Sequence, residues 1–181
     1  MNGLRKSRTC QILEHAEQAK FTKTRSLFGY WRKLQEAGRP TRASLDPVEM
    51  KPYLPNLLTG HIEPAPFRVL YKLVGTVVAE YSQCDFSNRY LDELSYSGRD
   101  DVDWEECYRQ LHETRRPVTG ECSLKGTAGC VIASYEYAIL PLWRDRDPAG
   151  SFVAIEVYDG IDTHRIPDWT KVTLRTRSAD C

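Results

Sequence analysis

The sequence lacks the features of a membrane-spanning or exported chain. None of its 181 residues belongs to an uninterrupted apolar run of about 18, the length that a membrane helix needs. The first 20 residues mix charged and polar side chains and have no apolar middle segment of the kind found in signal peptides. We therefore expect a cytoplasmic protein.

Common catalytic and cofactor-binding motifs are also absent. The sequence contains no G-x-S-x-G, H-E-x-x-H, G-x-x-x-x-G-K or G-x-G-x-x-G. Its six cysteines include no C-x-x-C pair, and none of its four histidines is spaced from a cysteine or another histidine as zinc ligands are. This pattern predicts reduced thiols, no bound metal, no cofactor and no catalytic activity.

Net charge is zero, but the charges are unevenly distributed. Residues 1–42 hold ten Lys or Arg and three Asp or Glu, whereas the rest of the chain holds fifteen and twenty-two. Residues 1–24 are therefore expected to form a basic, weakly packed arm, with at most a helix near 11–20. Docking of this arm on the acidic body is the alternative. No aromatic residue precedes Phe21, so nucleic acid would bind only non-specifically.

Apolar spacing predicts the elements of the first half of the chain. A helical stripe runs through residues 22–37 and ends at Gly38. Asp46-Pro47 is typical of a short helix with Asp as its cap and Pro at its first position. The remaining predictions are a β-hairpin formed by 57–63 and 67–74, a short helix at 76–81, and a loop with one helical turn at 84–98.

The second half predicts one amphipathic helix followed by three strands. The helix starts after the cap Asp103 and ends before Pro117. The strands are expected at 118–125, 130–142 and 151–158. If residues 126–129 form the first turn, then Val118 faces Tyr137, and the other pairs are Gly120 with Tyr135, Cys122 with Ala133, and Leu124 with Val131. One face is then apolar and the other polar, which predicts a sheet buried on one side only.

The order of these elements predicts an α+β fold with a five-stranded antiparallel sheet, helices on one face and an N-terminal helical extension. Six short motifs accompany this order of elements: Tyr30-Trp31, Leu45-Asp46-Pro47, Tyr53-Leu54-Pro55, Leu73-Val74-Gly75-Thr76, Asn88-Arg89-Tyr90-Leu91-Asp92-Glu93-Leu94 and Leu140-Pro141-Leu142. With these motifs, the sequence resembles a PAS domain and is similar to the PAS-like family of small stand-alone bacterial proteins. The resemblance covers residues 25–159, with 160–181 as a tail, and Ser82 and Asn88 stand where members often carry glycine.

The resemblance implies a sensory or protein-interaction module without catalysis. We expect it to bind a small ligand or a signalling protein and to act through protein–protein contacts. A cavity between the long helix and the sheet would hold the ligand. The candidate lining residues are Tyr71, Trp104, Tyr108, His112, Cys122 and Tyr137.

Two other functions stay open at this point. One is a small-molecule enzyme of the cone-shaped isomerase-like α+β class, which needs a buried Asp or Glu that the apolar strand faces do not offer. The other is a structural interaction protein with a filled core. His61 and Cys84 are interpreted as structural residues rather than as a haem ligand and a flavin-reactive thiol.

The first helix suggests a homodimer. Its apolar stripe can pack on the body of the same chain, but Phe28 lies to one side of that stripe. Leu27, Phe28 and Trp31 are therefore the candidate interface residues, with packing of Phe28 on its own chain as the alternative.

Overall fold

The computed structural model describes residues 7–12, 18–96, 102–125, 131–144, 147–159 and 172–174. Its main sheet is antiparallel and has six strands in the order β1-β5-β6-β7-β2-β3. These strands are β1 (Ser7–Ile12), β2 (Leu57–Pro64), β3 (Phe67–Val74), β5 (Val118–Lys125), β6 (Val131–Arg144) and β7 (Asp147–Asp159). The expected α+β fold is confirmed, and its five predicted strands are neighbours within this sheet.

Four α-helices in the described part of the chain accompany the sheet, and their starts follow the sequence signals. They are α1 (Thr22–Ala37), α2 (Pro47–Met50), α3 (Thr76–Ser82) and α4 (Trp104–Thr114). Asp46 caps α2 by accepting a 2.7 Å hydrogen bond from the Val48 amide, and Asp103 caps α4 by accepting one of 3.0 Å from the Glu106 amide. Short 3-10 turns lie at Arg42–Ser44, Leu54–Asn56 and Leu91–Glu93.

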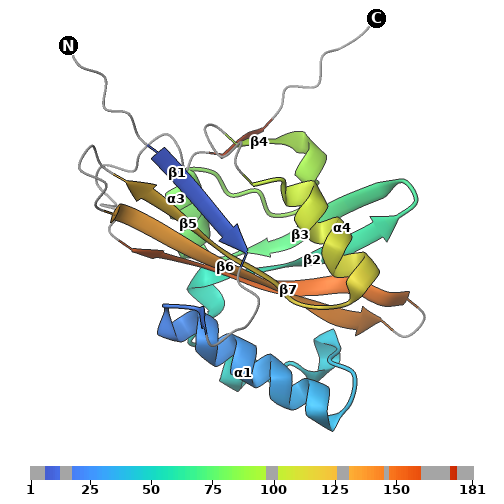
Figure 1. Ribbon diagram of the computed structural model, residues 1–181. Coiled ribbons are helices and arrows are strands. Elements are labelled where there is room, and N and C mark those ends of the chain that lie inside the picture. Colours follow the sequence, from blue (N-terminus) through green and yellow to red (C-terminus); the bar gives the residue numbers. More distant parts are fainter. Residues whose placement is uncertain are drawn as a thin grey trace, which may run out of the picture.

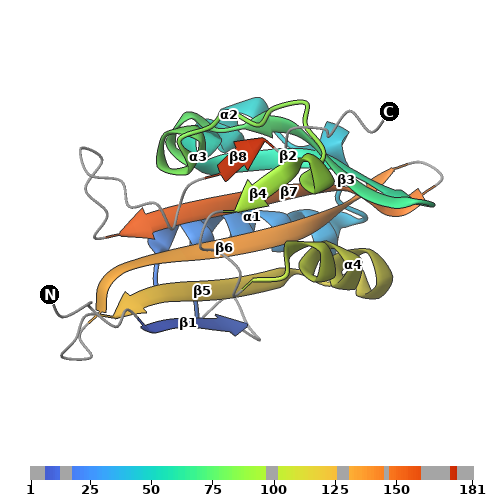
Figure 2. The same ribbon diagram turned by 90° about the horizontal axis from the view of Figure 1, so that it is seen from above.

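The helices lie on both faces of the sheet. Helix α1 covers one face, while α3, α4 and a small second sheet cover the other (Figures 1 and 2). The second sheet pairs β4 (Leu94–Tyr96) with β8 (Val172–Leu174). The sequence predicts a loop at β4 and a tail at β8, because three residues are too few to show the alternation of apolar and polar side chains that is typical of a strand.

The pairing of β5 with β6 differs from the prediction by two residues. Val118 faces Ile139, Gly120 faces Tyr137, Cys122 faces Tyr135 and Leu124 faces Ala133. A bulge between Leu124 and Lys125 accompanies this shift. Gly120 also favours the observed register, since a Cβ there would lie 2.4 Å from the Tyr137 ring. An even shift leaves each side chain on its predicted face.

The prediction that the sheet buries only one side is wrong. Thr119, Glu121, Ser134 and Glu136 lie on the face predicted to meet solvent, yet all four are buried. Helix α1 covers this face, where Leu27 and Trp31 pack against an apolar group made by β2, β6 and β7. The members from the sheet are Leu57, Ala138, Leu140, Leu142, Val153 and Ile155.

The segments flanking the expected domain add strands to it. Strand β1 pairs with β5 from Ser7↔Lys125 to Ile12↔Gly120, which corrects the expectation of a weakly packed arm. Gln11 and Ile12 are therefore in a strand rather than in the start of a helix. Strands β6 and β7 continue through Arg144↔Asp147, beyond the bounds at 142 and 151 that the sequence predicts.

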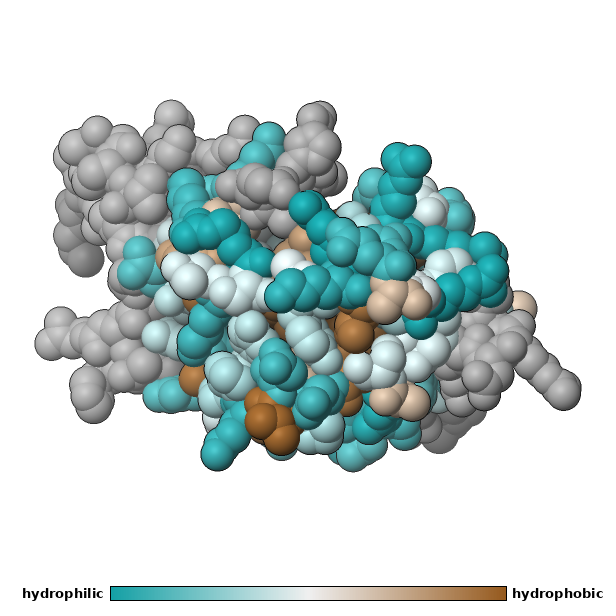
Figure 3. Space-filling view, turned by 90° about the horizontal axis from the view of Figure 1, so that it is seen from below, coloured by the Kyte–Doolittle hydropathy of each residue, from teal (hydrophilic) through white to brown (hydrophobic). Residues whose placement is uncertain are grey.

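Two of the three candidate dimer residues are buried against other parts of the same chain. Leu27 is 1 % and Trp31 is 3 % exposed, and Trp31 Nε1 donates a 2.9 Å hydrogen bond to the Pro141 carbonyl. Phe28 is half-buried and meets Trp31 edge-on at 5.8 Å between ring centroids. The α1 side of the molecule is mostly hydrophilic, with hydrophobic atoms in separate spots (Figure 3). Among the described helices, none is long and apolar enough to cross a membrane.

Candidate functional site

The space between α4 and the sheet is occupied by interlocking aromatic rings. Tyr71 of β3, Tyr108 of α4 and Phe152 of β7 meet at its centre, each at most 3 % exposed. Their ring centroids are 4.7 Å apart for Tyr108 and Phe152 and 6.0 Å apart for each pair with Tyr71. Such tilted and edge-on contacts are the favoured geometries of aromatic pairs. We call this group the aromatic core.

The other predicted lining residues extend this group. Trp104, at the start of α4, lies 4.9 Å from Tyr137 of β6 in an edge-on contact. His112, near the end of α4, is half-buried against Phe67 at 6.4 Å. Cys122 lies in β5 opposite Tyr135, and its side chain is outside the described residues. The structure therefore brings five of the six candidates together, and four of them fill the core.

One end of the aromatic core is polar. The Tyr137 hydroxyl and the Cys107 thiol share a hydrogen bond there. Burial raises the pKa of Tyr137 far above its usual value, and nearby Cys107 adds to the rise. Burial also raises the pKa of Cys107, an effect that its hydrogen bond to Tyr137 partly opposes. Both groups are therefore neutral at physiological pH.

A buried carboxylate lies at this end, which corrects the expectation that the apolar strand faces hold no Asp or Glu. Glu156 of β7 is 7 % exposed and is the cross-strand partner of Tyr137. The Tyr158 hydroxyl donates a hydrogen bond to Glu156 Oε2. The signal in the sequence is the period-2 series Phe152, Ala154, Glu156, Tyr158, which places Glu156 on the aromatic face.

Stacked tyrosines lead from this carboxylate toward the surface. Tyr158 stacks on Tyr81 of α3 at 4.3 Å and on Tyr135 of β6 at 5.7 Å between ring centroids. Tyr81 and Tyr158 are half-buried, whereas Tyr135 is 2 % exposed. We refer to Cys107, Tyr137, Glu156 and Tyr158 as the polar end of the core. Sequence reasoning proposed only Tyr137 among them.

The segment that follows α3 forms a side wall of the core. Phe86 meets Tyr71 edge-on at 5.0 Å, and Leu94 of β4 is 1 % exposed. The backbone runs along the outer edge of β3, where the Tyr71 amide donates to the Arg89 carbonyl at 3.0 Å. The Tyr71 carbonyl accepts a 2.8 Å bond from the Asn88 amide. This wall therefore covers the edge of β3.

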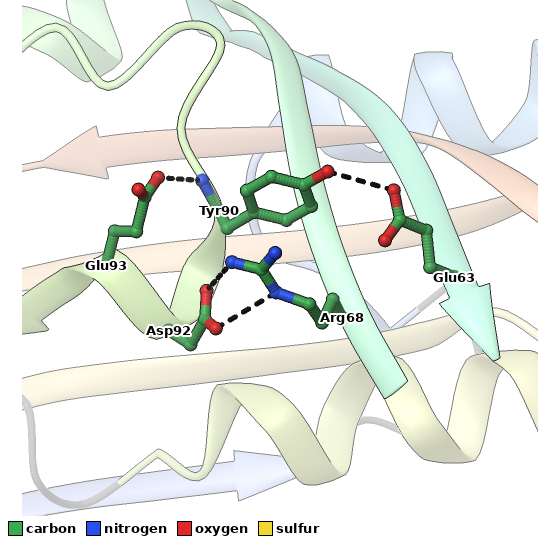
Figure 4. Close-up of polar contacts among 5 residues, drawn as sticks. All are labelled: Glu63, Arg68, Tyr90, Asp92 and Glu93. Carbon is green, nitrogen blue, oxygen red and sulfur yellow. Dashed lines mark hydrogen bonds and ion pairs between the residues drawn. The ribbon is translucent and has the colours of Figure 1, made fainter. Parts of the chain in front are cut away.

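A cluster of polar side chains holds the wall against the β2–β3 hairpin (Figure 4). Arg68 donates two hydrogen bonds to Asp92, of 3.0 and 2.9 Å, and its guanidinium lies 3.6 Å from the centroid of the Tyr90 ring. The Tyr90 hydroxyl donates to Glu63 at 3.0 Å. The hydrogen bond to Asp92 raises the pKa of Arg68, and the one to Glu63 raises the pKa of Tyr90.

The remaining cysteine and histidine candidates have ordinary surroundings. His61 Nδ1 lies 3.1 Å from Ser151 Oγ, within hydrogen-bond distance. Burial raises the pKa of the Cys84 thiol, so this thiol is mostly protonated at neutral pH. In the part of the chain that the structure describes, no three His, Cys, Asp or Glu side chains gather as metal ligands would.

The architecture agrees with a comparison against known families. The family model described as PAS domain matches residues 19–155, most of the chain. The chain belongs to the PAS domain family. A search of curated proteins found no match. The match to the PAS domain takes in α1, the hairpin, the wall, α4 and the strands around the aromatic core. It supports a sensory or interaction module in general terms.

Proposed function

We propose that this PAS domain is a signalling module that works by binding a partner protein rather than by enclosing a ligand in its core. The observation that carries the proposal is the aromatic core, in which Tyr71, Tyr108 and Phe152 contact one another directly. Because these rings are buried and close together, the usual ligand space of such a fold is taken up by side chains.

The packing gives a way to pass a signal between the two faces of the sheet. Strands β6 and β7 carry the aromatic core on one face and the α1 contacts on the other, in alternation along each strand. A partner that shifts α4 would therefore change the packing under α1, and the reverse also holds. This coupling supports output through protein–protein contacts.

A second candidate function is the binding of a small molecule at the polar end. The buried Glu156 carboxylate and its Tyr158 partner favour it, since they place a hydrogen-bonding group beside half-buried aromatic rings. A ligand there would enter beside Tyr81 and Tyr158. It would carry donors for Glu156 and an aromatic or cationic part for the tyrosines.

We also propose that the protein is not an enzyme. The isomerase-like alternative needs a carboxylate and a tyrosine that exchange protons near neutral pH. Glu156 and Tyr137 are cross-strand partners, but the strongly raised pKa of Tyr137 makes it unsuited to that role. Neutral thiols at Cys84 and Cys107 are likewise poor nucleophiles.

We propose that the protein is located in the cytoplasm of a bacterial cell. Cys84 and Cys107 are free thiols, which suits that reducing compartment.

We also propose that the protein forms a homodimer through α1. The dimer would use Phe28 and the exposed side of the helix, since Leu27 and Trp31 are buried against their own chain. Light scattering tests this part, and a monomer at high concentration would contradict it.

Native mass spectrometry of protein purified from its own cells tests the main proposal. The expected result is a complex with one partner protein in a fixed ratio and no bound small molecule. A chain carrying a stoichiometric small molecule would overturn the proposal and support the second candidate. Glu156→Gln should then lose that molecule, whereas the matched surface variant Glu105→Gln on α4 should keep it.

A further inference from the structure

Trp143, near the end of β6, carries two arginine side chains on its ring. The guanidinium carbon of Arg39 lies 5.0 Å from the ring centroid, and that of Arg115 lies 5.4 Å from it. Both distances are in the range of cation–π contacts. Arg39 and Arg115 are exposed, and Trp143 is half-buried. We call this group the Arg–Trp surface.

Three distant parts of the chain meet at this surface. Arg39 follows the end of α1, Arg115 follows the end of α4, and both helices point to the end of the sheet where β6 terminates (Figure 1). The Trp143 amide donates a 2.7 Å hydrogen bond to the Pro40 carbonyl, and Thr41 forms a bridge with Trp143. The backbone therefore fixes Arg39 beside the ring.

The charges at this surface have no carboxylate partner among the described residues. Arg68 and Arg109 elsewhere pair with Asp92 and Glu105, but Arg39 and Arg115 make no ion pair with any described side chain. Two more exposed arginines, Arg42 and Arg116, adjoin them in sequence and also have no ion-pair partner there. The structure thus places two guanidinium groups, those of Arg39 and Arg115, on one tryptophan ring without a described carboxylate partner.

A stabilising effect on the helix ends does not account for this arrangement by itself. Cationic side chains near helix C-termini do interact favourably with the helix dipole. Arg115, however, takes the left-handed conformation with φ +57° at the end of α4, where glycine is the usual residue. The backbone of an arginine is strained in this conformation, and the side chain of Arg115 lies on Trp143.

We propose that the Arg–Trp surface docks an acidic segment of a partner protein, with Asp or Glu carboxylates bound by Arg39 and Arg115. This inference rests on the proposed function and names the chemistry of the partner. A guanidinium that lies on an aromatic ring keeps its N–H groups available at its edge, and its planar fork matches a carboxylate. Trp143 limits the rotamers of both arginines, so less conformational freedom is lost on binding.

Other anionic partners fit this surface less well. Single-stranded nucleic acid needs open aromatic faces for base stacking, and the Trp143 ring already carries guanidinium groups. A membrane surface needs apolar side chains that insert into the lipid boundary. Among described residues, the exposed large hydrophobic side chains are Val48, Leu54, Leu73 and Leu174, and none belongs to this surface.

NMR titration with a hexapeptide of alternating aspartate and glutamate tests the proposal. The indole N–H signal of Trp143, assigned with Trp143→Phe, should shift with the acidic peptide but not with its asparagine–glutamine analogue. The double variant Arg39→Gln/Arg115→Gln should weaken binding about fivefold or more, the effect of losing two exposed charge pairs. Arg109→Gln removes one charge from α4 outside this surface and should leave the affinity unchanged.

The outcomes separate this inference from the proposed function. Equal affinity of wild type and the double variant would overturn the docking site. Tighter Arg39- and Arg115-dependent binding of a single-stranded oligonucleotide or of anionic phospholipid vesicles at the same salt would also overturn it. If the double variant still co-purifies with a stoichiometric partner, the docking site is wrong and the proposed function stands. Loss of that partner in the double variant, but not in Arg109→Gln, supports both.

Discussion

Glu121 and Glu136 are direct cross-strand partners in β5 and β6, and both are buried under the start of α1. The Lys20 ammonium lies 2.5 Å from Glu121 Oε1. The backbone amides of Lys20 and Phe21 donate to the two oxygens of Glu136, the second at 3.1 Å. Two neighbouring carboxylates are thus balanced by one ammonium group and by the N-terminal end of a helix.

Glu136→Ala should lower the free energy of unfolding by roughly 2–4 kcal/mol, because two buried amides lose their acceptor. Relief of the repulsion from Glu121 offsets only part of this loss. Glu136→Gln keeps one acceptor oxygen and should lose less. Urea unfolding followed by circular dichroism measures both values, and an unchanged midpoint for Glu136→Ala would refute the role of Glu136.

Deletion of residues 1–12 should destabilise the protein, because β1 pairs with β5 along its whole length. We expect the Tm to fall by at least about 2–4 °C, the shift that corresponds to ~1 kcal/mol for a chain of this size. Backbone hydrogen bonds are insensitive to salt, so the loss should be similar at low and high ionic strength. A loss confined to low salt would mean that the arm is held by charge alone, and no loss would mean a free arm.

The local elements and the pairing of strands next to each other in the chain were predictable from the sequence, whereas contacts between distant segments were not. The apolar stripe of α1 and the helix caps Asp46 and Asp103 can be recognised from residues that are only a few positions apart in the sequence. Strand β1 has no such signal, because its place depends on the edge that β5 leaves open. The buried Glu136 was missed for the same reason, since the cover over its face comes from a segment more than 100 residues away.

The residues of the candidate site were also only partly predictable from the sequence. Aromatic residues at helix and strand spacing identified Tyr71, Trp104, Tyr108 and Tyr137, because large aromatic side chains are usually buried. Glu156 was missed although the alternation along β7 places it on the aromatic face, because a glutamate side chain is usually exposed. The Arg–Trp surface unites side chains from three separate segments, and no spacing in the sequence brings these segments together.

Gly120→Ala should destabilise the protein by about 1–3 kcal/mol, the range of overpacked core substitutions. The added methyl group would lie 2.4 Å from the buried Tyr137 ring, which cannot move without disturbing Trp104. Gly29→Ala in α1 is the matched control, since nothing lies within 4 Å of its Cβ position. The control should be neutral or up to roughly 1 kcal/mol more stable in chemical denaturation.

The Arg68–Asp92 pair can be measured by a double-mutant cycle. Arg68→Ala and Asp92→Ala should each destabilise the protein, and their coupling energy should be about 0.5–1 kcal/mol, because the pair is bidentate but partly exposed. Arg68→Ala should cost more than Asp92→Ala, since it also removes the contact with the Tyr90 ring. Faster amide hydrogen exchange of residues 88–90 should accompany both changes. Strictly additive effects would show that the two side chains do not interact.

Stability at alkaline pH should depend on Tyr137. The unfolded chain releases this phenolic proton near pH 10.0, whereas burial raises the pKa of Tyr137 in the folded chain above that value. Above about pH 10 the folded state therefore binds more protons than the unfolded state, and the free energy of unfolding falls as the pH rises. Tyr137→Phe removes this contribution, so its urea midpoint should fall less steeply between roughly pH 9 and 11. Tyr90 titrates in both proteins and leaves the comparison intact. Parallel slopes for wild type and Tyr137→Phe would show that Tyr137 ionises in the folded protein as it does in the unfolded chain.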